Sequence, residues 1–128
     1  MKIISIDPGK NVGVIMAEVT NGKLMIEKSD HFESYDFFKF LDSISRDVRL
    51  IIVESFVMST RSKAETHALE QIGALKYYAY KKLNLILQSS SSQRSVKKLM
   101  EGEPDFPTNR HEVSAYKHLL FWYRRTST

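Results

Sequence analysis

The chain has 128 residues, of which 42% are hydrophobic and 27% charged, a balance that is typical of a globular chain and excludes a disordered one. It contains no cysteine, which excludes a disulfide framework and any thiolate metal site and is typical of a reducing cytoplasm. The formal net charge of +4 favours a polyanionic partner. The apolar run at the start stops after a few residues, so we expect neither a signal peptide nor a membrane span.

The length allows one hydrophobic core, so we expect a single domain over residues 1–128. Residues 2–7 predict a buried strand that ends in a carboxylate and is broken by Pro8-Gly9. Apolar residues resume over 12–19, and Asn21-Gly22 is a hairpin signal, after which 23–28 returns in alternation. The chain therefore opens as a three-stranded antiparallel meander.

Helices and strands alternate in the middle of the chain. Ser34 is predicted to cap a helix over 35–46, and a second buried strand over 49–54 again ends in a carboxylate. A polar loop over 55–62 then leads into a long helix over 63–83.

The last third begins with a short strand over 85–88 and a polar linker over 89–92. A short basic helix over 93–100, a loop over 101–109 broken by two prolines, and a final helix over 110–125 follow. This order predicts an α/β fold in which the antiparallel meander joins parallel strands in one mixed sheet, with helices on both faces.

The long helix carries bulky side chains on two faces. Gly73 lowers its helix propensity, which predicts close packing against a neighbour. A second face carries Tyr77, Tyr80 and nearby aromatic residues. Either one face covers the sheet and the other binds a twofold partner, or the sheet and its helices bury both. The first face consists of Ala68, Ile72, Leu75, Ala79 and Leu83.

Two acidic residues, Asp7 and Glu54, end the two most apolar strands. In α/β sheets ligands bind at the carboxyl ends of the strands, so adjacent strands would bring both carboxylates together. Two such carboxylates repel each other, and a shared divalent cation is their natural occupant. The alternative is that each acid simply faces solvent. Sugar kinases and actin-like ATPases also open with a strand, Asp and Gly, but they need two such domains.

The final helix carries a third polar group. A zinc-protease HExxH motif fails here, because position 115 holds alanine where the motif needs histidine. His111, Ser114 and His118 share one helix face, whereas Glu112 lies well around from it. A histidine on a half-buried helix face is more often a hydrogen-bonded packing residue than a metal ligand.

Taken together, these pieces resemble the RuvC-type Holliday junction resolvases, particularly the short forms typical of phages, within the ribonuclease-H-like fold. The resemblance runs through IISIDPGKNVGV, IIVESF, ETHALEQIGALKYYAYKKLNLILQSSSSQRSVKK and RHEVSAYKHLLFW. The last segment resembles the family's His-x-x-Asp-Ala signature and its downstream histidine. The order and spacing of the four segments carry the resemblance, since no one of them is specific.

The resemblance implies a homodimeric endonuclease that resolves four-way DNA junctions with Mg2+, or with Mn2+ as a substitute. Asp7 would bridge two ions, Glu54 would hold the second, and His111 would occupy the third acidic position. Bound metal would activate the attacking water and stabilise the leaving 3′ oxygen. A phage origin would place the protein in the cytoplasm of a bacterial host.

The chain departs from the family pattern at Ser114, where the last carboxylate is expected and a hydroxyl is a poor Mg2+ ligand. Three explanations stay open: a naturally weakened or inactive relative, an engineered substitution, or metal ligation shifted to His111 and a neighbour. Glu112 faces the wrong way on a regular helix, and Asp105 would serve only if its loop folds back. Junction binding would survive the change, since it depends on charge and shape.

Basic and apolar residues surround the predicted site. Phe56 and Met58, in the loop after the second acidic strand, are suited to wedge into an opened junction. Lys81-Lys82 and Arg124-Arg125 are equally explained as solvated helix ends. The predicted DNA-contacting residues are Lys10, Phe56, Arg61, Lys63, Arg94, Lys97 and Lys98.

Three other functions remain open. Ser114 favours a non-catalytic protein of the same fold that binds branched DNA without cutting it. A nuclease of this fold could instead act on RNA or flap DNA. A nucleotide-binding fragment would bind ATP and show no salt-sensitive DNA binding.

Overall fold

The computed structural model describes residues 1–55, 63–80, 82–89, 92 and 109–126, with the backbone alone at 63–65. The predicted basic helix over 93–100 lies outside these residues, as does nearly all of the two loops predicted over 55–62 and 101–109.

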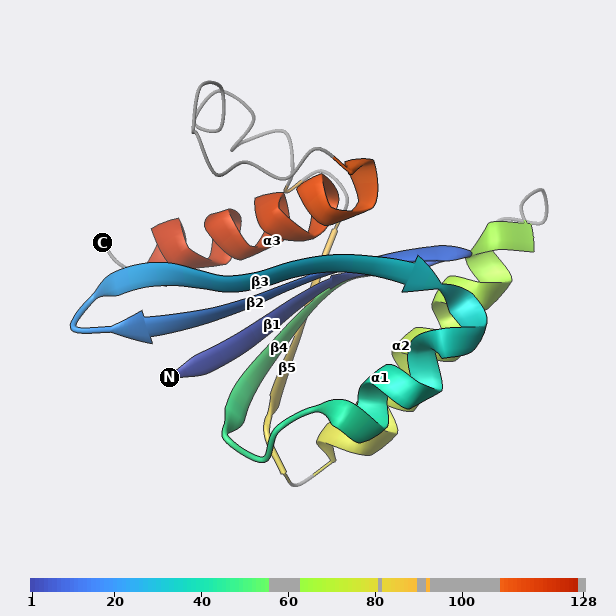
Figure 1. The fold of residues 1–128 in the computed structure, drawn as a ribbon, viewed down its shortest axis with the longest axis horizontal. Helices are drawn as coiled ribbons and strands as arrows, with labels where there is room; N and C mark the ends of the chain where they lie inside the picture. The colour runs from blue at the N-terminus through green and yellow to red at the C-terminus, as the bar shows by residue number, and fades with distance from the viewer. Residues whose placement is uncertain (56–62, 81, 90–91, 93–108, 127–128) are drawn as a thin grey trace.

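One five-stranded mixed sheet, in the order β3-β2-β1-β4-β5, forms the centre of the fold (Figure 1). β1 (Lys2–Asp7), β2 (Asn11–Thr20) and β3 (Lys23–Glu33) form the predicted antiparallel meander. β4 (Val48–Glu54) pairs in parallel with β1, and β5 (Asn84–Gln88) pairs in parallel with β4. The prediction of a mixed sheet is confirmed, and the two acidic strands β1 and β4 are direct neighbours.

Helices cover both faces of the sheet, as predicted (Figure 1). A 3-10 turn, η1 (Ser34–Asp36), leads into α1 (Phe37–Ser43), which lies with α2 (Lys63–Ala79) on one face. α3 (Arg110–Thr126) lies alone on the other. No helix among the described residues is long and apolar enough to span a membrane.

Successive side chains of each strand point to opposite faces of the sheet, so the core consists of two layers. Ile4 and Ile6 of β1 face α1 and α2, whereas Ile3 and Ser5 face α3. The predicted apolar stripe is confirmed for its first four members, which are buried in α2, whereas the fifth, Leu83, is partly buried but lies beyond the end of the helix. The layer beneath α3 contains Ile3, Ile15, Ala17, Leu50, Ile52, Ala115, Tyr116 and Leu119.

Several predicted element boundaries are wrong, and the first two predicted helices end early, α1 at Ser43 rather than residue 46 and α2 at Ala79 rather than residue 83. β3 runs to Glu33 rather than residue 28, because its polar second half pairs along β2 and shows no apolar alternation in the sequence. Ser34 does not cap α1, which starts three residues later. Its hydroxyl instead accepts a hydrogen bond from Gln71 and lies 3.0 Å from Nδ1 of His67, both in α2.

The predicted close packing of Gly73 is also wrong. A Cβ atom placed on Gly73 would meet no described atom within 4 Å, since this part of α2 faces outward. The close approach occurs at Gly13 of β2, where a Cβ would lie 2.0 Å from the backbone oxygen of His111. Gly13 therefore allows the first turn of α3 to rest directly on the sheet.

Candidate active site

A row of five residues crosses the α3 face at one end of the sheet, with one residue from each strand. His31, Gly13 and Asp7 are paired across β3, β2 and β1. Glu54 and Gln88 are paired across β4 and β5. Asp7 and Glu54 directly follow the last paired residues of the parallel strands β1 and β4, which joins the two halves of the row.

The first turn of α3 is fixed above this row. The side-chain oxygen of Asn109 caps the helix, because it accepts hydrogen bonds from the backbone N–H groups of His111 and Glu112 at 2.9 and 3.2 Å. This cap, together with the close approach at Gly13 of β2, places Nδ1 of His111 3.2 Å from Oδ2 of Asp7.

Asp7 and Glu54 are close enough for a side-chain hydrogen bond, and they are only 8% and 6% exposed. Burial, followed by the charge of Glu54, raises the pKa of Asp7 to about 8. A hydrogen bond from Ser114 acts in the opposite direction but does not offset these effects. Without a cation, Asp7 therefore carries a proton at neutral pH.

Burial, followed by the positive charges of Arg110 and His31, lowers the pKa of His111. At neutral pH the contact between His111 and Asp7 is thus a hydrogen bond between two neutral groups rather than an ion pair. A neutral imidazole is the form that can ligate a metal ion.

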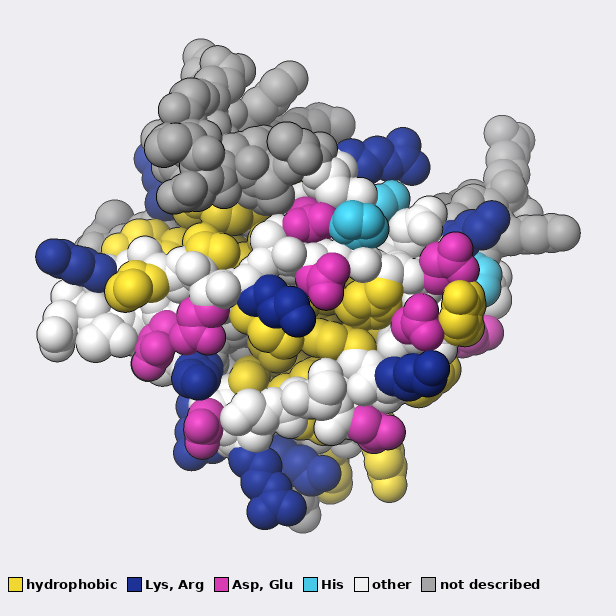
Figure 2. All heavy atoms as spheres, viewed as in Figure 1, with side chains coloured by type: hydrophobic (Ala, Val, Ile, Leu, Met, Phe, Trp, Pro, Cys, Tyr) yellow, Lys and Arg dark blue, Asp and Glu magenta, His cyan; other side chains and the backbone are white. Residues whose placement is uncertain are grey.

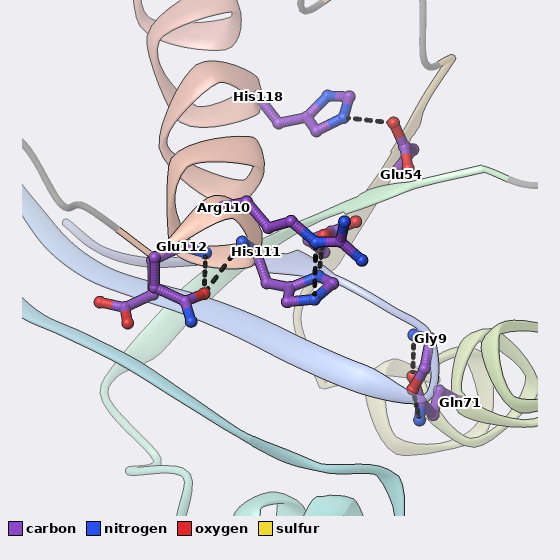
Figure 3. Close-up of polar contacts among 9 residues, drawn as sticks. Gly9, Glu54, Gln71, Arg110, His111, Glu112 and His118 are labelled. Atoms are coloured by element: carbon purple, nitrogen blue, oxygen red, sulfur yellow. Dashed lines mark hydrogen bonds and ion pairs between the residues drawn. The ribbon is translucent and has the colours of Figure 1, made fainter. Parts of the chain in front are cut away.

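The turn after Asp7 is held by Gln71 of α2 (Figure 3). The backbone N–H of Gly9 donates to the Gln71 oxygen at 2.8 Å, and the Gln71 amide donates to the oxygen of Gly9 at 2.9 Å. Gly9 has a φ of +150°, a conformation that side chains disfavour. The predicted tight turn is therefore present, and α2 fixes it from the opposite side of the site.

Glu54 has a histidine partner from α3 (Figure 3). Nε2 of His118 lies 3.1 Å from Oε1 of Glu54, and its Nδ1 lies 2.7 Å from the side-chain oxygen of Gln88. The sequence interpretation of a hydrogen-bonded, packed histidine is confirmed for this residue.

Glu112 faces away from the two carboxylates, as its helix position predicted. Its carboxylate is buried against β3, where it accepts a hydrogen bond from Ser29 and contacts Nδ1 of His31. These contacts fasten α3 to the outer strand of the meander. Glu112 is therefore not available to replace the missing carboxylate at Ser114.

The chemistry of these residues fits a divalent cation. Among the described residues, no three His, Asp or Glu side chains form a ready-made metal site. Asp7 and Glu54 nevertheless offer hard oxygen ligands to Mg2+ or Mn2+, which commonly keep water and substrate phosphate oxygens as further ligands. A cation would also relieve the repulsion that raises the pKa of Asp7.

Few of the predicted DNA-contacting residues can be placed. Lys10 is exposed directly after the Gly9 turn, at the same corner as Asp7. Arg110 was not among them, yet it is exposed and its Nε lies 3.4 Å from Nε2 of His111. The residues singled out from the sequence whose side chains lie outside the described part of the chain are Phe56, Met58, Arg61, Lys63, Arg94, Lys97, Lys98 and Asp105.

Sequence analysis missed several residues that shape the site. Gln71 interrupts the apolar stripe of α2, and Gln88 ends β5 level with the acidic strand ends. Both could have been noticed as polar residues within buried elements. Gly13 and His31 give no such signal, because their roles depend on where α3 is placed.

A groove of about 390 Å³ between β3 and α1 lies on the opposite face from these residues (Figure 2). Its base is apolar and charged side chains stand at its rim. It is lined by Val14, Met16, Lys28, Asp30, Phe32, Asp36, Lys39, Phe40 and Ser43. The candidate site is therefore separate from this groove.

No protein-family model matches the chain, and no curated protein sequence matches it. Solved structures do resemble it. The RuvC of Thermus thermophilus bound to a Holliday junction substrate has a TM-score of 0.76 at 14% identity, over 98% of this chain and 96% of that one. Another structure of the same protein has a TM-score of 0.75 at 14% identity, over 99% of this chain and 98% of that one. Fowlpox virus resolvase, in a complex with Holliday junction DNA, gives 0.67 at 11% identity, over 98% and 99%.

The mixed sheet with helices on both faces is a ribonuclease-H-like α/β fold. Within that class, the chain has the fold of the RuvC-type Holliday junction resolvases.

Proposed function

We propose that this chain is a divalent-metal-dependent endonuclease that cuts branched DNA, with the four-way junction as its substrate. The observation that carries the proposal is the buried pair Asp7 and Glu54, at the ends of adjacent parallel strands. Similar folds occur in proteins solved with Holliday junction DNA, which supports this substrate over others.

Asp7, Glu54 and His111 would hold the cation, with Ser114 as a weak fourth partner. The chemistry supplied by two bound Mg2+ or Mn2+ ions is activation of the attacking water and stabilisation of the leaving 3′ oxygen. Asp7 must release its proton before it can ligate a cation. The Asn109 cap and Gly13 keep His111 beside Asp7.

Basic residues near the site would bind the DNA backbone. Lys10 and Arg110 are exposed at the corner occupied by Asp7 and His111, and the net charge of +4 favours a polyanion. The other DNA contacts proposed from sequence remain part of this hypothesis.

We further propose that the protein acts as a homodimer, since a four-way junction needs two nicks. Tyr77 of α2 and Tyr80, directly after the helix, are 86% and 66% exposed, so the described residues do not bury this surface. This exposure favours α2 as the surface that a second copy would cover.

One observation favours a second candidate, a non-catalytic junction-binding protein. Ser114 contributes a hydroxyl to Asp7 where a carboxylate is expected, and Glu112 is engaged by β3 instead. A site with two carboxylates would bind the cation weakly. The fold and the basic surface would still bind DNA.

Cleavage of a labelled synthetic four-way junction in Mg2+ and in Mn2+ tests the proposal. The protein is compared with Asp7→Asn and Ser114→Asp. We expect slow paired nicking that Asp7→Asn abolishes and Ser114→Asp increases about 10-fold or more, because a restored carboxylate strengthens metal binding. If no variant cuts but all bind the junction at low salt, the binding protein is the correct function. If none binds junction DNA, both candidates are wrong.

A further inference from the structure

We infer that His118 is a positioning residue that orients Glu54 for the cation, with Gln88 holding His118 from behind. The inference rests on the proposed function and extends it to two residues, His118 and Gln88, to which sequence analysis assigned no role in the site. α3 thereby supplies one histidine to each carboxylate, since His111 contacts Asp7 and His118 contacts Glu54.

Both ring nitrogens of His118 face oxygen atoms, one from Glu54 and one from Gln88. An ionised carboxylate can only accept hydrogen bonds, so the contact of 3.1 Å requires a proton on Nε2 of His118 that points at Oε1 of Glu54. The side-chain oxygen of Gln88 lies 2.7 Å from the other ring nitrogen, Nδ1, and can accept a hydrogen bond from it. This contact fixes the orientation of the Glu54 carboxylate, which is also within hydrogen-bonding reach of Asp7.

The complete burial of His118 is not explained by a role in core packing alone. His118 is 0% exposed and belongs to a helix whose neighbouring buried residues, Ala115 and Leu119, are apolar. An apolar residue of similar size, together with apolar partners, would serve the core about as well. A histidine, a glutamine and a glutamate gathered at the carboxyl ends of the strands instead resemble the hydrogen-bonded surroundings of metal ligands.

The first test compares two substitutions of similar bulk. His118→Phe keeps the volume and removes the donor, whereas His118→Gln keeps an N–H donor. We expect His118→Phe to weaken Mn2+ binding, measured by electron paramagnetic resonance, by about 10- to 100-fold, as loss of a ligand's hydrogen-bond partner does. His118→Gln should recover most of that loss. Junction binding without metal should stay unchanged for both.

Controls separate positioning from general destabilisation. Leu75→Ala lowers stability from the far side of the sheet and should leave the Mn2+ affinity of the folded protein unchanged. In a Glu54→Gln background, His118→Phe should have no further effect on Mn2+ affinity. Equal Mn2+ affinity of His118→Phe and the wild-type chain would overturn the inference, as would additive losses in the double variant.

A measurement without metal keeps the inference testable if the proposed function fails. If the wild-type chain neither binds Mn2+ nor cuts, the nuclease proposal is wrong. The nuclear magnetic resonance signals of the His118 ring then test whether His118 still orients Glu54. We expect Glu54→Gln to shift the Nε2 proton and nitrogen signals of His118 in the metal-free protein. Unchanged signals would mean that His118 does not orient Glu54.

Discussion

The two faces of the sheet are built differently. The layer beneath α1 and α2 is almost entirely apolar, and among the described residues Gln71 is the buried polar side chain that it contains. The layer beneath α3 combines an apolar half with a polar row. The buried polar residues on that face are Ser5, Asp7, Glu54, Gln88, Glu112 and His118.

This difference shows how stability and function are divided in a small domain. Apolar burial under α1 and α2 stabilises the sheet without directional constraints. α3 must match several polar partners at once, through Glu112 at β3, His111 at β1 and His118 at β4. Changes beneath α3 should therefore alter metal and DNA chemistry, while equal changes among the apolar residues beneath α1 and α2 should alter stability alone.

The largest effects are expected from cavities, one on each face. Leu75→Ala and Leu119→Ala each remove a fully buried side chain and should lower the free energy of unfolding by about 2–5 kcal/mol. Urea denaturation measures this loss. Only Leu119→Ala should also weaken Mn2+ binding by the folded protein, because it loosens α3. Equal Mn2+ affinities of the two variants would break the proposed division between the faces.

The protonation of Asp7 predicts that the stability of the protein depends on pH, an effect that the apolar layer beneath α1 and α2 cannot produce. Burial raises the pKa of Asp7 from its ordinary value of 3.8 to about 8, so the folded state binds more protons than the unfolded chain between these limits. Stability of the metal-free protein should therefore fall as pH rises from about 4 to about 8, and each unit of pKa difference corresponds to about 1.4 kcal/mol.

Asp7→Asn should abolish most of this pH dependence and stabilise the metal-free protein at pH 8. Thermal unfolding at a series of pH values measures both effects. For the same reason, the apparent Mn2+ affinity of the wild-type chain should increase with pH up to about 8, because the cation displaces the proton of Asp7. An Mn2+ affinity that does not change between pH 6 and pH 8 would contradict the raised pKa.

Two glycine substitutions should change the free energy of unfolding in opposite directions. Gly13→Ala places a methyl group against the backbone of His111 and should lower the free energy of unfolding by about 1–3 kcal/mol or more. Gly73→Ala meets no described atom and should raise it by up to about 1 kcal/mol through helix propensity. Chemical denaturation compares the two. A loss of stability in both variants would show that Gly73 is packed after all.

The smallest effect on stability is expected at the exposed face of α2. Tyr77→Lys should change the free energy of unfolding by no more than about 0.5 kcal/mol, because the side chain is 86% exposed. If α2 forms the dimer surface, sedimentation analysis should show fewer dimers than for the wild-type chain. An exposed residue of α1, Phe38, provides the matched control Phe38→Lys. Equal dimer content in all three proteins would exclude this surface.

Local patterns predicted much of the architecture. The strands over 2–7 and 49–54 were recognisable because both faces are covered, so nearly every residue is buried and apolar residues dominate the middle of each strand. The hairpin at Asn21-Gly22 was recognisable because a two-residue turn needs positive φ, and both residues have it. Neither inference needs contacts between distant parts of the chain.

The acids at the strand ends were also visible in the sequence. Asp7 and Glu54 each end an apolar run, and the fold places the two runs side by side. Their shared site was a prediction from the parallel order of the strands. The raised pKa of Asp7 was not predicted in size, since it depends on burial and on the charge of Glu54.

Tertiary structure alone decided which polar residues surround these acids. Gln71 reaches Gly9 across 62 positions of sequence, and His111 reaches Asp7 across 104. Hydrophobic periodicity reports which face of an element is buried, because that depends on neighbours three or four residues away. A buried hydrogen bond depends on the placement of one whole element against another, which no local pattern encodes. The sequence thus determined the sheet and its acidic ends, whereas the docking of α2 and α3 determined the rest of the site.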